Sequence, residues 1–211
     1  MPLSKEHKRQ TRERIVRTAS RAFRAGGIER TGIADLMQQA GLTHGGFYAH
    51  FPSKDALVAE ACAAGLEESS ETLLAAAVKA PPGEELRAII VNYLSPRHRD
   101  APATGCMVAA VAAELSHEPV AVRARFTAAL DTYFARLERY LPGIDEHARR
   151  DHLRVLFSGM AGALALARAV TDQQESDRIL AAAREFYTRA FTEAGTQEGL
   201  PTERRMDDAE Q

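Results

Sequence analysis

The feature that most constrains this 211-residue chain is its nearly continuous helix-forming character. Alanine, leucine, arginine and glutamate dominate, and no segment alternates polar and apolar residues as a half-buried strand does. Glycines and prolines fall at intervals suited to connections between helices. The sequence therefore predicts an all-α fold. The expected helices cover residues 5–25, 33–40, 44–51, 54–79, 84–94, 106–115, 120–141, 145–170 and 176–194, and residues 95–105 are expected to form a loop.

Charge divides the chain unevenly. Residues 1–54 hold ten lysines and arginines against four acidic residues, whereas the remainder holds 17 against 25. Such asymmetry favours a short basic domain that contacts a polyanion, fused to an acidic body with another role. A helix with a solvated cationic face would give the same charge, so this observation alone leaves both interpretations open.

Several classes of protein are disfavoured by what the sequence lacks. No run approaches the roughly 18 apolar residues that a membrane span needs, and the charged N-terminus is not followed by the apolar segment of a signal peptide. Cys62 and Cys106 are too few for a disulfide framework or a cysteine-rich zinc site. We therefore expect a cytoplasmic protein with two free thiols, no membrane partner, no metal and no cofactor.

The stretch "GLTHGGFYAHFPSK", residues 41–54, predicts two short helices joined by a tight turn at Gly41. Thr31 is expected to cap the first helix, Thr43 the second, and Ser53 the long helix that follows. Two short helices around a glycine turn are typical of a helix-turn-helix, whose second helix is presented to the DNA major groove.

The second short helix has two distinct faces. Phe47 and Phe51 are four residues apart and share one face, while His44 and Tyr48 share another. We expect the phenylalanines to pack in the core and the other face to read DNA.

Gly45 and Gly46 lie inside this helix, although a glycine in a helix interior costs about 1 kcal/mol relative to alanine. One explanation is that a helix without side chains at these positions can approach the DNA backbone or groove wall closely. The other is that the glycines permit close packing between helices within the protein.

The segment "TGIADLMQQAGLTHGGFYAHFPSKDAL", residues 31–57, resembles the TetR family of bacterial transcriptional regulators. It follows a basic first helix, and the resemblance rests on an ordered combination rather than on any single residue. That combination is an inward apolar set followed by Gly41-Leu42, Phe47-Tyr48, His50-Phe51 and Ser53-Lys54. Beyond residue 79 the likeness consists only of size and all-helical character.

The resemblance implies a ligand-responsive DNA-binding regulator, most often a repressor, that binds a palindromic operator as a homodimer. Residues 1–54 would form a three-helix helix-turn-helix domain, and residues 55–195 a larger helical domain that binds an effector and dimerises through its last two helices. Residues 196–211 are expected to be a disordered tail. The residues implied to contact DNA are Thr31, Gly32, Thr43, His44, Gly45, Gly46, Tyr48, His50 and Lys54.

A small-molecule effector would bind between the middle helices, in a largely apolar pocket with a few polar groups. We name candidate lining residues on that basis, although aromatic residues and methionines on helices are more often ordinary core. The candidates are Tyr93, Cys106, Met107, Phe126, Tyr133, Phe134 and Met160. Cys106 also begins a helix, where the helix dipole can lower a thiol pKa, so an alternative is a repressor that senses thiol-reactive compounds.

Two other classes are kept as rivals. A helical enzyme with a basic arm is one, but the chain has no phosphate-binding glycine loop, nucleophile elbow or two-histidine metal motif. His147 and Asp151 are four residues apart and offer two metal ligands, yet nothing nearby completes a site. A scaffold protein is the other, and it would leave residues 31–54 unexplained.

Overall fold

The computed structural model describes residues 5–143 and 145–193, and within them it contains helices and no strand, which confirms the all-α prediction. The predicted tail at 196–211 lies outside the described residues. The α-helices are α1 (Lys5–Gly26), α2 (Ile33–Gln39), α3 (Lys54–Val78), α4 (Glu85–Tyr93), α5 (Pro96–Asp100), α6 (Met107–Leu115), α7 (Val120–Leu137), α8 (Glu146–Ala169) and α9 (Gln173–Thr188). Shorter turns are the 3-10 helices η1 (His44–Ala49), η2 (Pro102–Thr104) and η3 (Glu138–Tyr140), and the π-helix η4 (Arg189–Glu193).

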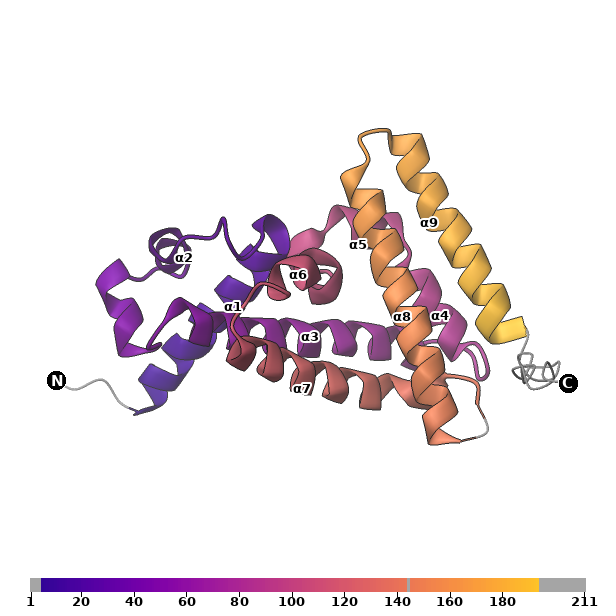
Figure 1. Ribbon diagram of the computed structural model, residues 1–211, viewed down its shortest axis with the longest axis horizontal. Helices are drawn as coiled ribbons and strands as arrows, with labels where there is room; N and C mark the ends of the chain where they lie inside the picture. The colour runs from indigo at the N-terminus through magenta and orange to yellow at the C-terminus, as the bar shows by residue number, and fades with distance from the viewer. Residues whose placement is uncertain (1–4, 144, 194–211) are drawn as a thin grey trace, which may run out of the picture.

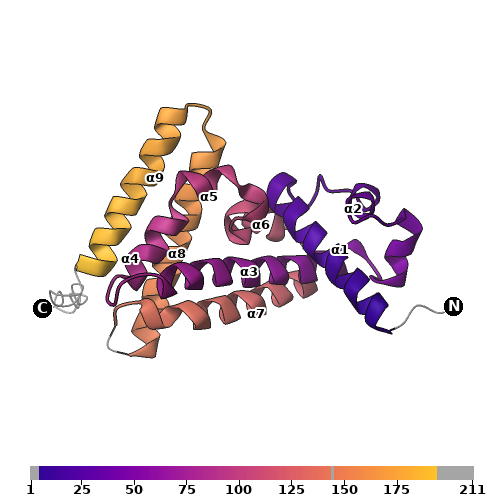
Figure 2. The same cartoon turned by 180° about the vertical axis from the view of Figure 1, so that it is seen from behind.

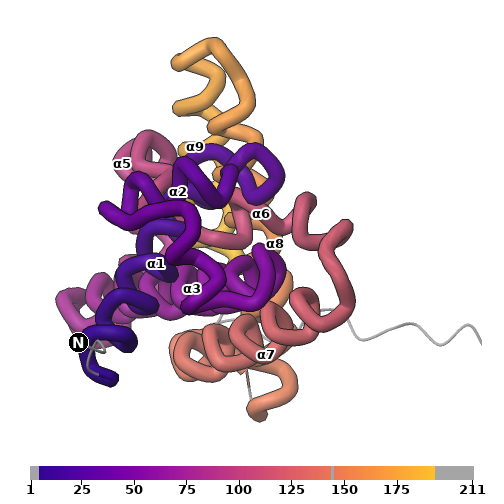
Figure 3. The backbone as a smooth tube through the Cα atoms, turned by 90° about the vertical axis from the view of Figure 1, so that its left-hand side faces the viewer, coloured from indigo at the N-terminus to yellow at the C-terminus, as the bar shows by residue number. Residues whose placement is uncertain are grey.

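The helices form two groups at opposite ends of the long axis of the molecule, and two further helices connect the groups (Figure 1). α1 and α2 occupy one end, α8 and α9 the other, and α3 and α7 run side by side between them. The reverse view in Figure 2 shows the same order, with α6 between the α1–α2 end and α8. Figure 3 looks onto the end formed by α1, α2 and the start of α3. None of the described helices is both long and apolar enough to cross a membrane.

Amphipathic α1 is held against this end by one apolar stripe. Ile15, Ala19 and Phe23 are fully buried, whereas Arg14, Arg17 and Arg21 on the remaining faces are exposed. Arg24 is the exception, because it is buried, donates to the carbonyl of Gly105 (2.9 Å) and pairs with Glu68 on α3. Burying side chains of this size removes their apolar surface from water and fixes the helix in place. The basic face of α1 therefore stays in solvent.

Gly41 forms the turn after α2, as predicted. Its φ of +68° lies in the left-handed region that favours glycine. The N–H of Leu42 donates to the carbonyl of Met37 (2.8 Å), and the N–H of Gly41 donates to that of Gln38 (2.9 Å). This is the Schellman arrangement, which satisfies carbonyls at a helix end and turns the chain sharply toward η1.

Three local predictions were wrong. The segment after Thr43 is a 3-10 helix ending at Ala49, not an α-helix ending at Phe51, because two glycines and a short length leave little helix propensity. Gly32, not Thr31, is the N-cap of α2, since the Thr31 hydroxyl instead donates to the carbonyl of Gly27 (2.7 Å). The predicted loop at 95–105 contains α5, which begins with Ser95 as N-cap and proline at its first position.

Glycines allow two close helix crossings in the body. A Cβ added at Gly65 on α3 would lie 2.3 Å from Cε of Met107 on α6. One added at Gly159 on α8 would lie 1.7 Å from the hydroxyl of Tyr187 on α9. The close approach at Gly159 is therefore made within the chain, whereas Gly162 has open space where its side chain would be.

Candidate nucleic-acid interface and buried cavity

η1 separates its side chains into a buried and an exposed set, as the sequence predicted. Phe47 and Phe51 are fully buried, with ring centroids 5.7 Å apart. His44 and Tyr48 lie on the exposed side, their rings in an edge contact at 6.5 Å, and Tyr48 is 63% exposed. Burial of the phenylalanines fixes the orientation of η1, so His44 and Tyr48 are presented outward.

The glycine pair in η1 has no internal structural requirement. A Cβ added at Gly45 would meet nothing within 4 Å, and one at Gly46 would meet only Oγ1 of Thr43 at 3.5 Å and Cε of Met37 at 3.8 Å. Neither glycine has a positive φ. Close helix packing within this chain therefore does not explain the pair, and the surface it leaves bare at Gly45 faces outward.

The other residues predicted to contact DNA surround η1, and they differ in exposure and in the hydrogen bonds they already make. Thr43 is exposed at the start of η1 and makes no side-chain cap bond, and Gly32 is exposed at the start of α2. Lys54 is half-buried, and its Nζ donates to the carbonyl of Ile28 (2.8 Å). The Lys54 ammonium thus joins the start of α3 to the turn after α1.

His50, another residue predicted to contact DNA, is partly buried. Its Nδ1 is buried and has no partner among the described residues. Burial lowers the pKa of His50, and the neighbouring charges of Lys8, Arg12 and His7 lower it further. The ring is therefore neutral near pH 7, and a phosphate contact would have to come from its N–H rather than from an imidazolium.

Arg12 is a structural residue that the sequence analysis did not single out. Its guanidinium lies 4.0 Å from the centre of the Phe51 ring, donates to the carbonyl of His50, and pairs with Glu60 on α3. These contacts hold α1 against the end of η1. No periodicity in the sequence identifies residue 60 as the partner, because the two are 48 positions apart.

Glu114 links α6 to the turn between α1 and α2. Its carboxylate accepts the backbone N–H groups of Ile28 (2.8 Å) and Glu29 (2.9 Å) in that turn. Gly27, with a φ of +87°, leaves the space this carboxylate fills, since a Cβ there would lie 2.7 Å from its Oε1. α6 is thereby attached to the helix-turn-helix region through charge-assisted hydrogen bonds.

A cavity of about 470 Å³ lies between α3, α4, α5 and α7, next to the start of α6. Of the seven candidate pocket residues, Tyr93, Cys106 and Tyr133 line it, and all three are buried. The other four, which are not among its lining residues and belong to the packing of the body, are Met107, Phe126, Phe134 and Met160. Length and helical phase alone could not separate these two groups.

His98, on α5, is a cavity residue that the loop prediction missed. Its Nε2 accepts the N–H of Cys106 (2.9 Å), so Nδ1 carries the proton and donates to the carbonyl of Tyr93 (2.7 Å). Burial lowers the pKa of His98, with a smaller opposing effect from the Tyr93 carbonyl. A neutral imidazole thus connects the end of α4 to the N-cap of α6.

The surroundings of Cys106 do not favour the thiolate on which the alternative of a thiol-sensing repressor depends. Burial raises the pKa of this thiol, outweighing the lowering effect of nearby hydrogen-bond donors. Cys62 is likewise buried, and its pKa is raised to about 12. Both are free thiols, and both are neutral near pH 7.

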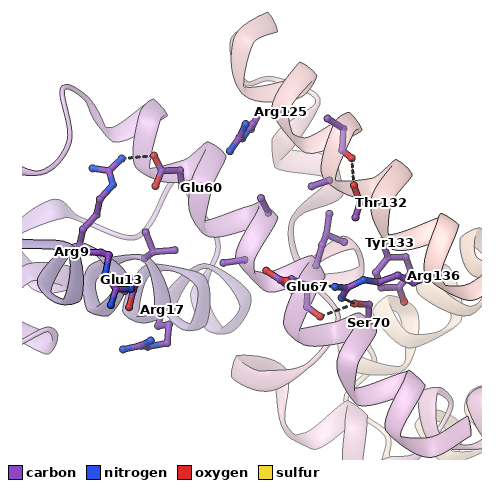
Figure 4. A pocket seen from close by; sticks show the side chains of 17 residues that line it. Arg9, Glu13, Arg17, Glu60, Glu67, Ser70, Arg125, Thr132, Tyr133 and Arg136 are labelled. Carbon is purple, nitrogen blue, oxygen red and sulfur yellow. Dashed lines mark hydrogen bonds and ion pairs between the residues drawn. The ribbon is translucent and has the colours of Figure 1, made fainter. Parts of the chain in front are cut away.

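A second cavity, of about 780 Å³, lies between α1, α3 and α7 and shares Tyr133 with the first. Figure 4 shows Arg136 reaching from α7 to Ser70 on α3, a bond of 2.8 Å. Arg136 also pairs with Glu67, and Arg12 on the opposite side pairs with Glu60. The α1 wall and the α7 wall of this second cavity are therefore each joined to α3 by an ion pair.

Comparison with known families decides the identity. The model described as bacterial regulatory proteins of the tetR family matches residues 15–61, and that of the tetracyclin repressor-like C-terminal domain matches residues 82–183. Together the two models span well over half of the chain. The protein belongs to the TetR family.

Individual relatives agree with this assignment. The HTH-type transcriptional regulator TtgR of Pseudomonas putida is 44% identical over 55 residues, which is 26% of this chain and 26% of TtgR. The chain thus matches about a quarter of that curated relative. A TetR-family regulator from Agrobacterium tumefaciens is 25% identical over 88% of this chain and 99% of its own, with a TM-score of 0.65. A TetR regulator from Chloroflexus aurantiacus J-10-FL is 25% identical over 92% and 98%, with a TM-score of 0.69.

Metal chemistry finds no support in the described part of this TetR-family chain. Across residues 5–143 and 145–193, no three histidine, cysteine or acidic side chains are grouped as a metal site. His147 and Asp151 form an exposed pair, with Nε2 and Oδ2 3.5 Å apart. The relatives named above are transcriptional regulators, which does not favour the enzyme alternative.

Proposed function

We propose that this TetR-family protein is a cytoplasmic, homodimeric repressor that binds a palindromic operator through α2 and η1 and is released from it by a small molecule. The observation that carries the proposal is the bare, outward surface at Gly45, which nothing in the described chain itself requires. A groove wall or phosphate backbone is the partner that such a surface admits.

The groups around the glycine pair suit DNA. Exposed His44 and Tyr48 offer ring N–H, lone-pair and hydroxyl groups to base edges or phosphates. Thr43 and the N–H groups at the starts of η1 and α2 are phosphate donors, and the exposed arginines of α1 add long-range attraction. Repression follows when a protein bound in this way occupies the operator.

The effector is assigned to the 470 Å³ cavity because α6 connects that cavity to the DNA-binding end. Cys106, the N-cap of α6, is bonded to His98 at the cavity, and Glu114 near the other end holds the turn between α1 and α2. A ligand that shifts α6 would therefore move the helix-turn-helix. By linkage, it must bind the DNA-incompetent conformation more tightly to release the operator.

Dimerisation is assigned to α8 and α9. Val155 and Leu166 on α8 and Phe186 on α9 are more than half exposed, and a group of large apolar side chains at the surface often marks a contact with another protein. Gly162 lies between the two α8 residues with open space above it, so a second helix can approach closely. A two-fold axis here would place two copies of η1 on one palindrome.

The test is selection of genomic DNA fragments by the purified full-length protein, followed by titration of the recovered site at several salt concentrations. We expect a palindrome and an affinity that falls steeply as salt rises, because phosphate contacts release counterions. Recovery of no preferred sequence would contradict the proposal.

Gly45→Ala tests the interface directly. The new methyl group meets nothing within 4 Å, so the melting temperature should be unchanged or slightly higher, while operator affinity should fall roughly tenfold or more. Gly26→Ala is the matched control, because it also adds a methyl group to open space but lies at the end of α1. Unaltered operator affinity in Gly45→Ala would remove the observation on which the proposal rests.

A further inference from the structure

Two tyrosines that line the 470 Å³ cavity have buried hydroxyls with no nitrogen or oxygen partner among the described residues. Tyr93 is 1% exposed and Tyr133 is 2% exposed, and the Oη atom of each is buried without a partner among the described residues. A buried hydroxyl that makes no hydrogen bond is unfavourable, and native proteins rarely retain one without a reason. Two in the wall of one cavity indicate groups that await a ligand.

Packing holds the two rings in place. Tyr93 comes from α4 and Tyr133 from α7, and both contact the ring of Phe157 on α8, at centroid distances of 6.0 and 4.9 Å. His98 meets the Tyr93 ring edge-on at 4.8 Å. Because the rings are fixed by these contacts, neither hydroxyl can turn into solvent to find water.

The other polar groups at the buried end are already used or are weak. The Ser69 hydroxyl donates to the carbonyl of Gly65 (2.7 Å), and both ring nitrogens of His98 are bonded. The neutral Cys106 thiol lies near the Tyr93 hydroxyl, but sulfur is only a weak acceptor.

The two phenols remain protonated. Burial raises the pKa of Tyr93 and of Tyr133 above the ordinary value for a phenol. The free hydrogen-bonding capacity at the buried end is therefore a pair of neutral O–H donors. Such a pair suits an acceptor atom on a ligand that carries no charge.

Among the lining residues, charge is confined to the rim and to one existing ion pair. Lys79 and Arg97 line the cavity but are exposed, and Glu68 is paired with Arg24, with Oε2 and Nη2 2.5 Å apart. Arg168, close to Cys106, donates to the carbonyls of His98 (2.8 Å) and Arg99 (3.1 Å). Arg168 is not among the lining residues, so a charged ligand group at the buried end would be desolvated without a free counter-charge in the cavity lining.

We propose that this cavity binds an uncharged aromatic carbonyl compound, whose oxygen accepts hydrogen bonds from Tyr93 and Tyr133 while its rings pack against the apolar part of the lining, which includes Leu73, Ala75 and Ala76 on α3. This inference rests on the proposed function, because it assumes that the cavity is the effector site. Its volume lies within the range of pockets that hold small molecules of one to a few rings.

Three matched compounds test the ligand class: benzophenone, diphenylmethane, which lacks the carbonyl, and diphenylacetate, which carries a charge. Calorimetric titration of the full-length protein should show benzophenone binding at least about tenfold more tightly than diphenylmethane, the increment expected for hydrogen bonds to one acceptor. Acetophenone and ethylbenzene form a smaller pair with the same expected order. Failure of both ketones to exceed their hydrocarbons, or tighter binding of diphenylacetate, would overturn the proposal.

Variants test the two hydroxyls without removing the rings. Tyr93→Phe and Tyr133→Phe should each reduce the preference for the ketone, and the double variant should abolish it. Tyr140→Phe, a change outside this cavity, should leave the preference intact. Without ligand, the first two variants should melt at a higher temperature than the wild type, because each removes a buried hydroxyl that has no partner. A ketone preference that survives in the double variant would overturn the assignment.

Operator binding separates the two proposals. A protein that binds no preferred DNA but discriminates ketone from hydrocarbon would refute the proposed function and leave the ligand assignment standing. A protein that binds its operator but shows no ketone preference would refute only the ligand class.

Discussion

The polar side chains of the two candidate sites, at η1 and in the cavity, differ in solvent exposure and in hydrogen bonding. At η1, His44 and Tyr48 lie in solvent, so water satisfies them before any partner arrives. In the cavity, Tyr93 and Tyr133 are buried and unsatisfied. The first site exchanges one set of hydrogen bonds for another on binding, whereas the second gains bonds that it did not have. The proposed DNA-binding surface therefore costs the fold little, while the two unsatisfied hydroxyls of the cavity cost the free protein stability that the proposed ligand would restore.

The largest effect on stability should come from a substitution in the core that packs beneath η1. Phe47→Ala removes a fully buried ring and should lower the free energy of unfolding by about 3–5 kcal/mol, enough to unfold the helix-turn-helix region. Tyr48→Phe removes only an exposed hydroxyl and should leave the melting temperature unchanged while weakening operator binding. Thermal unfolding and DNA titration of both variants provide the check, and an equal loss of thermal stability in the two would break the division between buried and exposed faces.

Glu114→Ala should have the next largest effect, because it acts on the connection between the two sites. Two backbone N–H groups would lose their acceptor, which should cost about 1–3 kcal/mol in the free energy of unfolding. Glu114→Gln keeps an acceptor oxygen and should recover much of this loss. Chemical denaturation of the two variants measures it. If Glu114→Gln were as destabilising as Glu114→Ala, charge rather than hydrogen bonding would hold the turn.

A smaller, pH-dependent effect should distinguish the sites further. Burial lowers the pKa of His98 at the cavity and of His50 near η1, so the folded state binds fewer protons than the unfolded state. Stability should therefore be fully present above a pH of about 6.5 and should decline as the pH falls below it. His98→Gln and His50→Gln should each flatten this decline, as measured by melting temperature between about pH 8 and about pH 5.5, the window that spans the ordinary histidine pKa. Identical pH profiles in the wild type and both variants would contradict the assignment.

The smallest expected effect is at the thiols. Buried, neutral Cys106 and Cys62 should resist iodoacetamide near neutral pH while the protein is folded and should react once denaturant is added. Mass spectrometry of timed samples measures the modification. Rapid alkylation of Cys106 in the folded protein would revive the alternative in which a thiol-reactive compound is the signal.

The exposed site could be predicted largely from sequence because its determinants are local. Gly41 turns the chain, Ser53 caps α3 by accepting the N–H of Ala56, and the spacing of Phe47 and Phe51 selects the buried face. Each of these interactions joins residues that are close together in the sequence. The 3-10 form of η1 was missed because the energy difference between two helix types is small in a short glycine-rich segment.

The cavity could be predicted only in part. Tyr93 and Tyr133 come from helices far apart in the sequence, and His98 lies on a helix that was expected to be loop. Aromatic residues on a helix carry no mark that distinguishes a cavity wall from ordinary core, so Phe134 was an equally reasonable candidate. The hydrogen bonds of Glu114 and Arg12 span 86 and 48 residues, and no helical periodicity predicts them.

Residues with different proposed roles lie on different helices, and this separation has a consequence for how such a protein evolves. The two unsatisfied hydroxyls belong to α4 and α7, whereas Glu114, which holds the turn between α1 and α2, belongs to α6. If the proposed ligand and route through α6 hold, substitutions at positions 93 and 133 alter which compound is recognised without changing α6 itself. On this proposal, a lineage, or a laboratory evolving a biosensor, would change the compound that is sensed while the operator that is bound stays the same.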